Sequence, residues 1–539
     1  MKALKKTLPY LKNILLPCLV FSAVTGVLTG LLIFLFKLAS SRVILLSAQA
    51  YALVRQNPWY VPLLVLSAGA LGLLAAWILR VSPNCRGGGI PTSIALLRGL
   101  IEFQWIKSVV LLFASSMLTY LCGVPLGNEG PSVQMGTAVG RGTVRLFAKK
   151  HRAWDRYIMT GGACAGFAAA TGAPITGIFF AFEEAHRRFS PTIFMSAAMT
   201  VIFGSATNEL LCRQAGISVS MFGPILADAL PLRFLWVAIF IGIVCGACAI
   251  GFTKVYRICG VLLKTKLRAL PFTLKVVAVF VAVSLIGLAS GSLIGSGHDL
   301  VHELLHGAGV WYLLILYFCV RAILLIVANN VGVTGGLFVP SLAFGAILGA
   351  LCARALMFAG LLGEQYYAIA VVIGMVSFLA ASSRTPITAI TFAAEALCGF
   401  LNILPITAGV TFAFLTIEMF GVIAFNETVL EGKVETENAG KTAHIVNSYL
   451  TVREGSFAVG KEIRDILWPP TCVVLSVDKN PATAGTVGIS AGDVLHLHYR
   501  SYDPPATQEL LEALVGEQMP DPRSNSQTED AHRQVPENS

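Results

Sequence analysis

The sequence has few charged residues for a chain of its length. Only 13% of its 539 residues are Asp, Glu, Lys or Arg, while 55% are apolar. Soluble globular proteins usually have about twice this share of charged residues, so an ordinary soluble enzyme is excluded. Uncharged apolar stretches at 14–36, 59–79 and 234–253 are each long enough to cross roughly 30 Å of membrane hydrocarbon as a helix. We therefore expect a polytopic membrane protein.

The sequence also has little that resembles a metal centre or a redox site. Its 12 cysteines are scattered singly, apart from Cys245 and Cys248, which form a CxxC inside an uncharged run. A zinc or redox site of this kind needs a second pair of ligands nearby. We expect these cysteines to pack in the protein interior, and we expect no bound cofactor.

The net charge of +10 comes from 39 basic and 29 acidic residues. The basic residues lie beside apolar segments, as the positive-inside rule expects, so we expect no nucleic-acid partner. The first apolar run is longer than a signal-peptide core and lacks a clear cleavage site, which favours a retained span. Basic residues before that run place the N-terminus in the cytosol: Lys2, Lys5, Lys6 and Lys12.

The composition changes sharply near Glu427, where charged residues, Pro, Asn and Thr become common and membrane-length segments stop. We place the membrane domain at 1–432 and a linker at 433–441. A small soluble domain at 442–516 and a disordered tail at 517–539 follow, the latter because its composition is polar.

Within the soluble domain, the sequence pattern predicts both strands and helices. Strands are expected at 449–452, 472–477 and 494–499, from β-branched residues and alternation. An amphipathic helix is expected after Ser456, and a short terminal helix at 508–515. The domain is therefore expected to be of the α+β class.

The membrane domain contains an internal repeat. The pattern GxxxPSxxxG occurs at 127–136 and again at 336–345. A second pair of segments, 168–183 and 380–395, shares a Pro-Ile-Thr core and a later Glu, in the same order and at nearly the same spacing. The domain is therefore a duplicated half, which is a common plan of transporters. Whether the halves are inverted depends on the number of crossings, and the sequence alone leaves this open.

Three glycine- and proline-rich segments, at 86–91, 127–131 and 336–340, stand at the start of apolar helical stretches. Pro suits the first turn of a helix, and Gly lets a ligand approach the backbone. The free N–H groups of such helix ends favour a desolvated anion. The alternative is that the glycines only allow tight helix packing in lipid; the set of three favours an anion site.

Three glutamates stand close to these segments. Glu129 lies in an apolar, glycine-lined stretch, and ionisable residues within membranes usually mark ion or proton routes. Ionised, it could occupy the anion site as a tethered competitor; protonated, it could leave and admit the anion. Glu183 and Glu184 precede a basic cluster, and at most one of two adjacent helical residues faces the interior. Either they are a solvated helix end, or one of them takes up protons from the cytosol.

The three glycine segments, at 87–91, 127–131 and 336–340, resemble in order the signature segments of the CLC chloride channel and transporter family. The resemblance covers roughly 14–432. It implies an all-α membrane domain made of two inverted halves, with anions held near mid-membrane by helix N-termini. It also implies a homodimer in which each subunit has its own pore, transporting chloride or a similar anion.

Carried over residue by residue, the resemblance assigns roles to four positions. Glu129 matches the gating glutamate, which the anion and proton paths share. The backbone amides of Leu337 and Phe338 match those that bind the central anion. Glu184 matches the internal proton glutamate found in proton-coupled exchangers and absent from most channels. Because both glutamates are present, the resemblance favours exchange over passive conduction.

The sequence departs from the family pattern at three positions. Gly88 stands where chloride-selective members usually have Ser, and Asn426 stands where many have a pore Tyr. The central site then depends on backbone amides and the Asn426 amide, so we expect weaker or less selective anion binding. Asn128 replaces the usual Arg or Lys of the second segment, which weakens the positive potential on the external side.

The soluble domain resembles a TrkA C-terminal (RCK-C) domain in its order of elements and in the segment 489–495. This implies a cytosolic regulatory module that pairs with its copy or binds a small ligand. It also favours a bacterial inner membrane, with both termini cytoplasmic. His496 and His498 share a strand face, and without a further ligand a solvent-facing strand is favoured over a metal site.

Three functions remain open from the sequence. The leading hypothesis is a proton-coupled anion exchanger, with chloride as the expected anion. The second is a passive voltage- or ligand-gated chloride channel. The third is an intramembrane enzyme that uses Glu129 with Glu183 or Glu184 as an acid/base pair, which is disfavoured because no HExxH zinc motif lies on an apolar helix.

Overall fold

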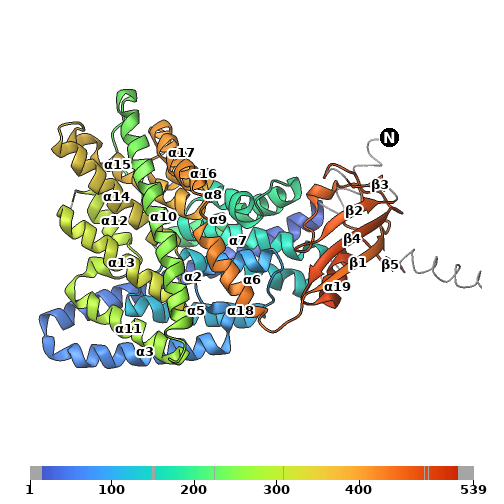
Figure 1. Cartoon of the computed structure of the whole chain (residues 1–539), viewed down its shortest axis with the longest axis horizontal. Coiled ribbons are helices and arrows are strands. Elements are labelled where there is room, and N and C mark those ends of the chain that lie inside the picture. Colours follow the sequence, from blue (N-terminus) through green and yellow to red (C-terminus); the bar gives the residue numbers. More distant parts are fainter. Residues whose placement is uncertain are drawn as a thin grey trace, which may run out of the picture.

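The computed structural model describes residues 15–147, 152–223, 225–307, 309–478, 480–482 and 485–519. The basic residues before the first helix and the tail beyond 519 lie outside the described residues. Among the described residues, eight helices are long and apolar enough to cross a membrane. The chain is a multi-pass membrane protein with a small strand-containing domain at one end (Figure 1).

The membrane domain has the same order of helices in each half. The first half contains α2 (Leu16–Gln56), α3 (Val61–Val81), α4 (Gly89–Leu97), α5 (Trp105–Cys122), α6 (Glu129–Phe147), α7 (Asp155–Thr171), α8 (Pro174–Phe180) and α9 (Pro191–Gln214). The second half contains α10 (Leu235–Thr265), α11 (Phe272–Ala289), α12 (His298–Leu305), α13 (Trp311–Val331), α14 (Phe338–Phe358), α15 (Tyr367–Ser383), α16 (Pro386–Phe392) and α17 (Ile403–Met419). α18 (Phe425–Glu437) follows.

Short helical segments join these elements. Single π-helical turns follow the equivalent helices α8 and α16: η5 (Ala181–Ala185) and η9 (Ala393–Leu397). Short 3-10 turns are η2 (Pro58–Tyr60), η3 (Pro83–Cys85), η4 (Arg152–Trp154), η6 (Leu232–Phe234), η7 (Gly291–Leu293), η8 (Glu364–Tyr366) and η10 (Ile463–Asp465).

The two copies of the glycine motif meet in the middle of the molecule. Gly127 and Gly336 form an isolated antiparallel bridge, in which each N–H donates to the other carbonyl at 2.7 and 2.8 Å. Gly127 thus pairs with its own equivalent in the second copy, which is the geometry of a local two-fold axis between the halves. The duplication predicted from the sequence is confirmed at the level of single hydrogen bonds.

The halves are also inverted. After α6, Arg152 contacts Glu509 of the C-terminal domain. Near the end of α14, Arg354 donates to the Gly307 carbonyl, beyond α12, at 2.8 Å, and Figure 1 places α12 and α14 away from the sheet. The equivalent helices α6 and α14 therefore start together and run to opposite faces, which resolves the question that the sequence left open.

The last glycine of each motif packs helices together. A methyl group added to Gly136 on α6 would lie 2.1 Å from the Gly162 carbonyl oxygen on α7. The equivalent contact, from Gly345 on α14 to Gly374 on α15, would be 2.3 Å. Helices in membranes approach this closely only through such small residues. The last glycine of each repeat therefore allows close helix packing, while the first glycines of the repeat form the central bridge.

The C-terminal domain is a five-stranded sheet with one helix. Its strands are β1 (His444–Thr451), β2 (Val473–Val477), β3 (Asn480–Pro481), β4 (Val494–Ser501) and β5 (Gln518–Met519), in the order β3-β2-β4-β1-β5, all antiparallel. Alternating residues of β4 are buried together with one face of α19 (Pro504–Leu514). The α+β class predicted for this domain agrees with these elements.

Three local predictions for this part of the chain need correction. The described residues after Ser456 form only the 3-10 turn η10 and not the expected amphipathic helix, because Gly455 and Gly460 adopt φ of +78° and +77°, and the Gly460 N–H pairs with the Ile489 carbonyl instead. α18 runs through 433–437, so this part of the linker is helical. β5 pairs with β1 and extends the sheet beyond residue 516.

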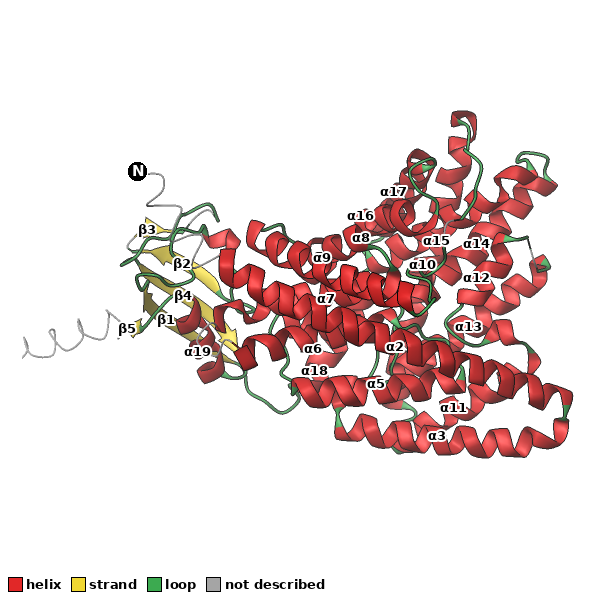
Figure 2. Ribbon diagram, turned by 180° about the vertical axis from the view of Figure 1, so that it is seen from behind, coloured by secondary structure: helices red, strands yellow, loops and turns green. Residues whose placement is uncertain are grey.

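The C-terminal domain is docked onto the membrane domain. The carbonyl groups of 465–468 accept hydrogen bonds at 2.8–3.2 Å from Arg156, Tyr157, Arg188 and Ser190. These donors lie at the start of α7 and just before α9, on the face of the membrane domain nearest the sheet (Figure 2). We call this face the domain side. We call the opposite face the vestibule side, after the large cavity next to Glu129 that is described below.

Candidate functional site

Three helix N-termini meet at a small cavity inside the membrane domain. Gly88 precedes α4, Leu337 and Phe338 stand at the start of α14, and Phe425 and Asn426 open α18, and all of them line the cavity. The cavity volume is about 20 Å³, enough for one water-sized group. Because each N-terminus carries a partial positive charge, the cavity suits a desolvated anion.

The glycines of the first segment allow these helix ends to come together. A methyl group on Gly89 would lie 1.9 Å from the Gly130 carbonyl oxygen, inside the backbone of the second segment. A methyl group on Gly130 would lie 2.8 Å from the Gly336 Cα atom, inside the third. The three glycine segments thus touch one another through backbone alone, as the anion-site interpretation of the sequence requires.

Glu129 lies on the vestibule side of this meeting point. Its side chain is fully buried, and neither carboxylate oxygen has a hydrogen-bond partner in the described part of the chain. The backbone N–H groups of Asn128, Glu129 and Val339 face the carboxylate without reaching hydrogen-bond geometry. Its Oε2 atom would lie 2.3 Å from a methyl group on Gly127 and 3.2 Å from one on Gly336. The carboxylate therefore packs against the central bridge.

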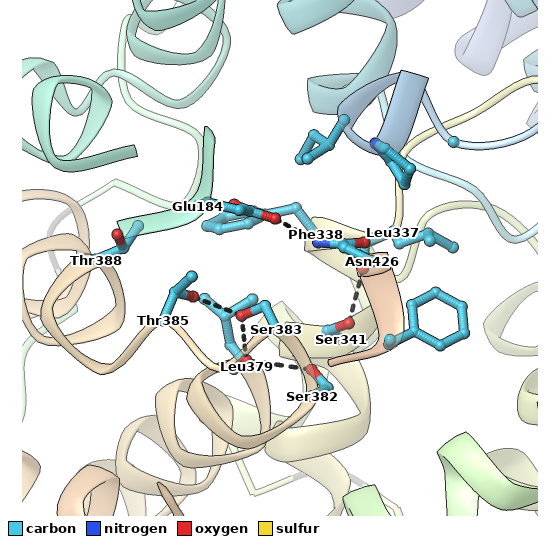
Figure 3. A pocket seen from close by; sticks show the side chains of 14 residues that line it. Glu184, Leu337, Phe338, Ser341, Leu379, Ser382, Ser383, Thr385, Thr388 and Asn426 are labelled. Atoms are coloured by element: carbon cyan, nitrogen blue, oxygen red, sulfur yellow. Dashed lines mark hydrogen bonds between the residues drawn. The ribbon is translucent and has the colours of Figure 1, made fainter. Parts of the chain in front are cut away.

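Glu184 lines the cavity from the domain side. Its side chain is 9% exposed, and its Oε1 atom accepts a hydrogen bond from the Asn426 amide (Figure 3). Arg98 donates to the Glu184 and Ala185 carbonyls at 3.2 and 2.9 Å, and it also pairs with Glu427 at 2.9 Å. The carboxyl group is thus held against a residue of the anion cavity itself.

Glu183 has a different role from its neighbour. It accepts hydrogen bonds at 2.6–2.8 Å from the backbone of 387–388 and from the Thr388 hydroxyl, at the start of α16. Glu395 accepts the equivalent bonds at 2.8–2.9 Å from 175–176, at the start of α8. Each half of the repeat therefore caps a helix of the other half. Glu183 is a helix cap and not a solvated helix end.

Replacing Glu183 by Ala should lower the free energy of unfolding by about 2 kcal/mol, because charge-assisted capping bonds are lost at the partly buried start of α16. Glu395→Ala should have a similar effect by symmetry. Thermal unfolding of the purified protein in detergent measures both. Glu209→Ala is the control, since Glu209 forms an exposed pair with Arg213 within one helix. Equal melting temperatures for all three variants would contradict the capping role.

The sequence interpretation missed the hydroxyl groups in the cavity. Ser382, Ser383 and Thr385 line it, and Ser383 Oγ lies 2.5 Å from Thr385 Oγ1 and donates to the Leu379 carbonyl at 2.7 Å (Figure 3). They precede Pro386 in the second repeated segment, which was the available signal. The N-terminus of α18 was also missed as a helix end that faces the cavity.

A larger vestibule lies on the other side of the bridge. Its volume is about 810 Å³, and Glu129 and Asn128 line it together with parts of α2 and α12. Glu129 lines this vestibule, whereas Gly88, Glu184, Leu337, Phe338 and Asn426 all line the inner cavity. The predicted site residues therefore lie on the two sides of one barrier.

One motif escaped the sequence interpretation. Residues 302–306 read HELLH, an HExxH pattern, in and just beyond the last turn of the short helix α12. The rings of His302 and His306 stack at 5.8 Å. Within the described residues, however, no group of three His, Cys, Asp or Glu side chains is placed to hold a metal ion.

The histidine pair of the C-terminal domain, on β4, does not act together either. His496 stacks on the Tyr449 ring of β1 at 4.4 Å, and His498 Nδ1 lies 2.8 Å from Asn447 Oδ1 of the same strand.

Comparisons with known proteins agree with this geometry. The family model described as "Voltage gated chloride channel" matches residues 71–418, which is more than half of the chain. The chain is 29% identical over 448 residues to the H(+)/Cl(-) exchange transporter ClcA of Cronobacter sakazakii, covering 79% of this chain and 92% of that protein.

Solved structures have the same fold. A slow cyanobacterial Cl-/H+ antiporter matches with a TM-score of 0.72 and 26% identity, covering 78% of this chain and 99% of the other. A eukaryotic CLC transporter matches with a TM-score of 0.65 and 22% identity, covering 78% and 74%. Together with the family match and the three converging glycine segments, these similarities show that the chain belongs to the voltage gated chloride channel (CLC) family.

Proposed function

We propose that this protein exchanges protons for an anion, with chloride as the expected substrate. The observation that carries the proposal is the position of Glu184, which lines the anion cavity and binds Asn426 there. A passive channel has no need for a buried carboxyl group on its anion path, because such a group repels the anion when ionised. The exchange activity named for the Cronobacter sakazakii and cyanobacterial relatives supports the same conclusion.

In the proposed cycle, the anion binds between the N-termini of α4, α14 and α18, at the amides of Leu337 and Phe338. Partial charges of helix ends attract it without a full buried cation that would hold it too tightly. Glu129, packed against the central bridge, competes for this path when ionised and leaves it when protonated. Protons reach it from the domain side through Glu184.

The two alternatives explain less of the site. A passive channel gives no role to the bond between Glu184 and Asn426. For an acid/base enzyme, Glu183 is unsuited because it caps α16, and Glu129 and Glu184 lie on opposite sides of the barrier. The relatives above are named as transporters, so we propose no enzymatic activity.

We expect anion binding in the cavity to be weak, and Gly88→Ser should strengthen it. The backbone of Gly88 has φ of −70°, and an added methyl group would meet its nearest neighbours at 3.4 Å, so Ser fits without strain. A hydroxyl donor to an anion should raise the chloride affinity about tenfold. Calorimetric titration with chloride measures this, with Gly88→Ala as the control that adds bulk without a donor. An equal affinity for the Ser and Ala variants would contradict the assignment of Gly88 to the anion site.

We further propose that the domain side is cytoplasmic and that the protein lies in a bacterial inner membrane, in keeping with the basic N-terminus and the RCK-C-like domain. We also propose a homodimer with one pore per subunit, as the resemblance to the family implies. In this arrangement the C-terminal domain regulates transport, either through pairing with its copy or through a small ligand.

The experiment that tests the exchange proposal uses a proton gradient alone. Vesicles containing the purified protein are made acidic inside, with equal chloride on both sides and the voltage held at zero. Proton efflux should then drive labelled chloride to accumulate inside. A channel would leave chloride at equilibrium.

A further inference from the structure

His298 is the first residue of α12 and lies in the vestibule with Glu129 and Asn128. Its side chain is 39% exposed, so water in the vestibule reaches it. His298 and Glu129 line the same vestibule, so a charge on one side chain acts on the other across it. A proton gained or lost at His298 therefore changes the electrostatic potential at the gating carboxylate.

Both ring nitrogens of His298 face hydrogen-bond acceptors. Nε2 lies 2.7 Å from the Met221 carbonyl oxygen, and Nδ1 lies 3.4 Å from Asp299 Oδ1. Neutral imidazole has one N–H and imidazolium has two, so only the charged form donates to both. α12 has eight residues and is too short to span a membrane, and the pKa of His298 is raised above its usual value, chiefly by Asp299 and against burial.

Other charged groups surround His298. The N-terminus of its own helix opposes a positive charge, while Asp299 favours it. Lys and Arg stay positive and Asp stays negative through the neutral range, whereas histidine titrates within it. With Asp299, protonation of His298 changes the pair from a net charge of −1 to zero. Among the described residues, the other charged or titratable groups of the vestibule and its walls are Lys37, Tyr51 and Arg55 on α2, Tyr120 on α5, Glu129 on α6, His302 and Glu303 on α12, and Arg321 on α13.

The charge change at His298 matters because the second glycine segment carries no fixed positive charge. The residue beside Glu129 in that segment is the neutral Asn128. We propose that His298 is a positioning residue that supplies a proton-dependent positive charge at this entrance and so raises the apparent affinity for chloride from the vestibule side as the pH falls. The inference rests on the proposed function, because it assigns His298 to the anion path of that same site.

The test compares the KM for chloride in wild type and His298→Gln, measured as chloride flux from vesicles at about pH 5.5 and about pH 8.5. Both proteins keep Glu129 and Glu184, so the ratio of the two KM values at each pH reports the loss of His298, including its effect on Glu129 in the shared vestibule. At the acidic pH, we expect the Gln variant to have a KM about threefold above that of wild type, because it lacks the positive charge that His298 carries there. At the alkaline pH, where His298 is neutral, we expect the same KM for both proteins. His302→Gln, one turn further along α12, is the matched control, and a chelator keeps metal ions away from 302–306.

A second variant keeps the test decisive if Gln impairs folding. His298→Arg carries a permanent charge, so its KM at about pH 8.5 should fall below that of wild type. The inference would be overturned if the ratio of the His298→Gln KM to the wild-type KM were the same at both pH values. It would also be overturned if the Arg variant had no lower KM than wild type at the alkaline pH. The KM comparison uses chloride flux alone and does not depend on proton movement. If a separate assay showed that wild type moves no protons, the exchange proposal would be refuted and the KM comparison would still stand.

Discussion

Replacing Glu184 by Gln is expected to abolish chloride-driven proton movement while chloride still crosses the membrane. Gln has nearly the same shape, and its side-chain carbonyl can still accept the hydrogen bond from the Asn426 amide. It cannot carry a proton on and off, so the domain-side proton route is cut. Proton flux should fall at least about tenfold, as measured with a pH electrode in liposomes under a chloride gradient at fixed voltage.

The neighbouring glutamate provides the control for this experiment. Glu183→Gln changes the adjacent residue in the same way, but Glu183 caps α16 and does not line the cavity. It should keep proton coupling even if its stability falls. Coupling that survives in Glu184→Gln, or that is lost equally in both variants, would show that Glu184 is not the proton carrier.

Replacing Gly89 by Ala is expected to prevent correct folding, at a cost of about 3 kcal/mol or more. The new methyl group would lie 1.9 Å from the Gly130 carbonyl oxygen and 2.7 Å from the Pro131 nitrogen. Both are backbone atoms at the start of α6, so no side chain can rotate away. α4 would have to separate from α6, and the three glycine segments could no longer meet.

Gly88→Ala is the matched control, since the neighbouring position has room for a methyl group at 3.4 Å. Size-exclusion chromatography and thermal unfolding in detergent compare the two variants. We expect a monodisperse, near-native Gly88→Ala protein and an aggregated or strongly destabilised Gly89→Ala protein. Equal behaviour would mean that backbone contact between the segments does not hold the site together.

The sequence was most informative where the site requires a particular backbone conformation. The segments around Gly88, Glu129 and Leu337 could be predicted because a helix that starts inside a membrane needs glycine and proline at fixed spacing. The repeat was visible for the same reason. These constraints are local along the chain, so a single sequence displays them.

Contacts between distant segments could not be predicted in this way. Nothing near Glu183 indicates that it caps a helix in the other half of the chain, because its partners at 387–388 are distant in sequence. The hydrogen bond between Glu184 and Asn426 is equally non-local. The helix predicted after Ser456 failed because two glycines with positive φ override a pattern of apolar residues. Pairing of this kind depends on the tertiary fold.

The most direct test of the account is proton movement in liposomes that contain the wild-type protein, driven by a chloride gradient alone with the voltage held at zero. The account predicts that protons move against their own gradient, in the direction opposite to chloride, until the proton gradient balances the remaining chloride gradient. Chloride flux without any uphill proton movement would contradict it and would make this protein a passive channel.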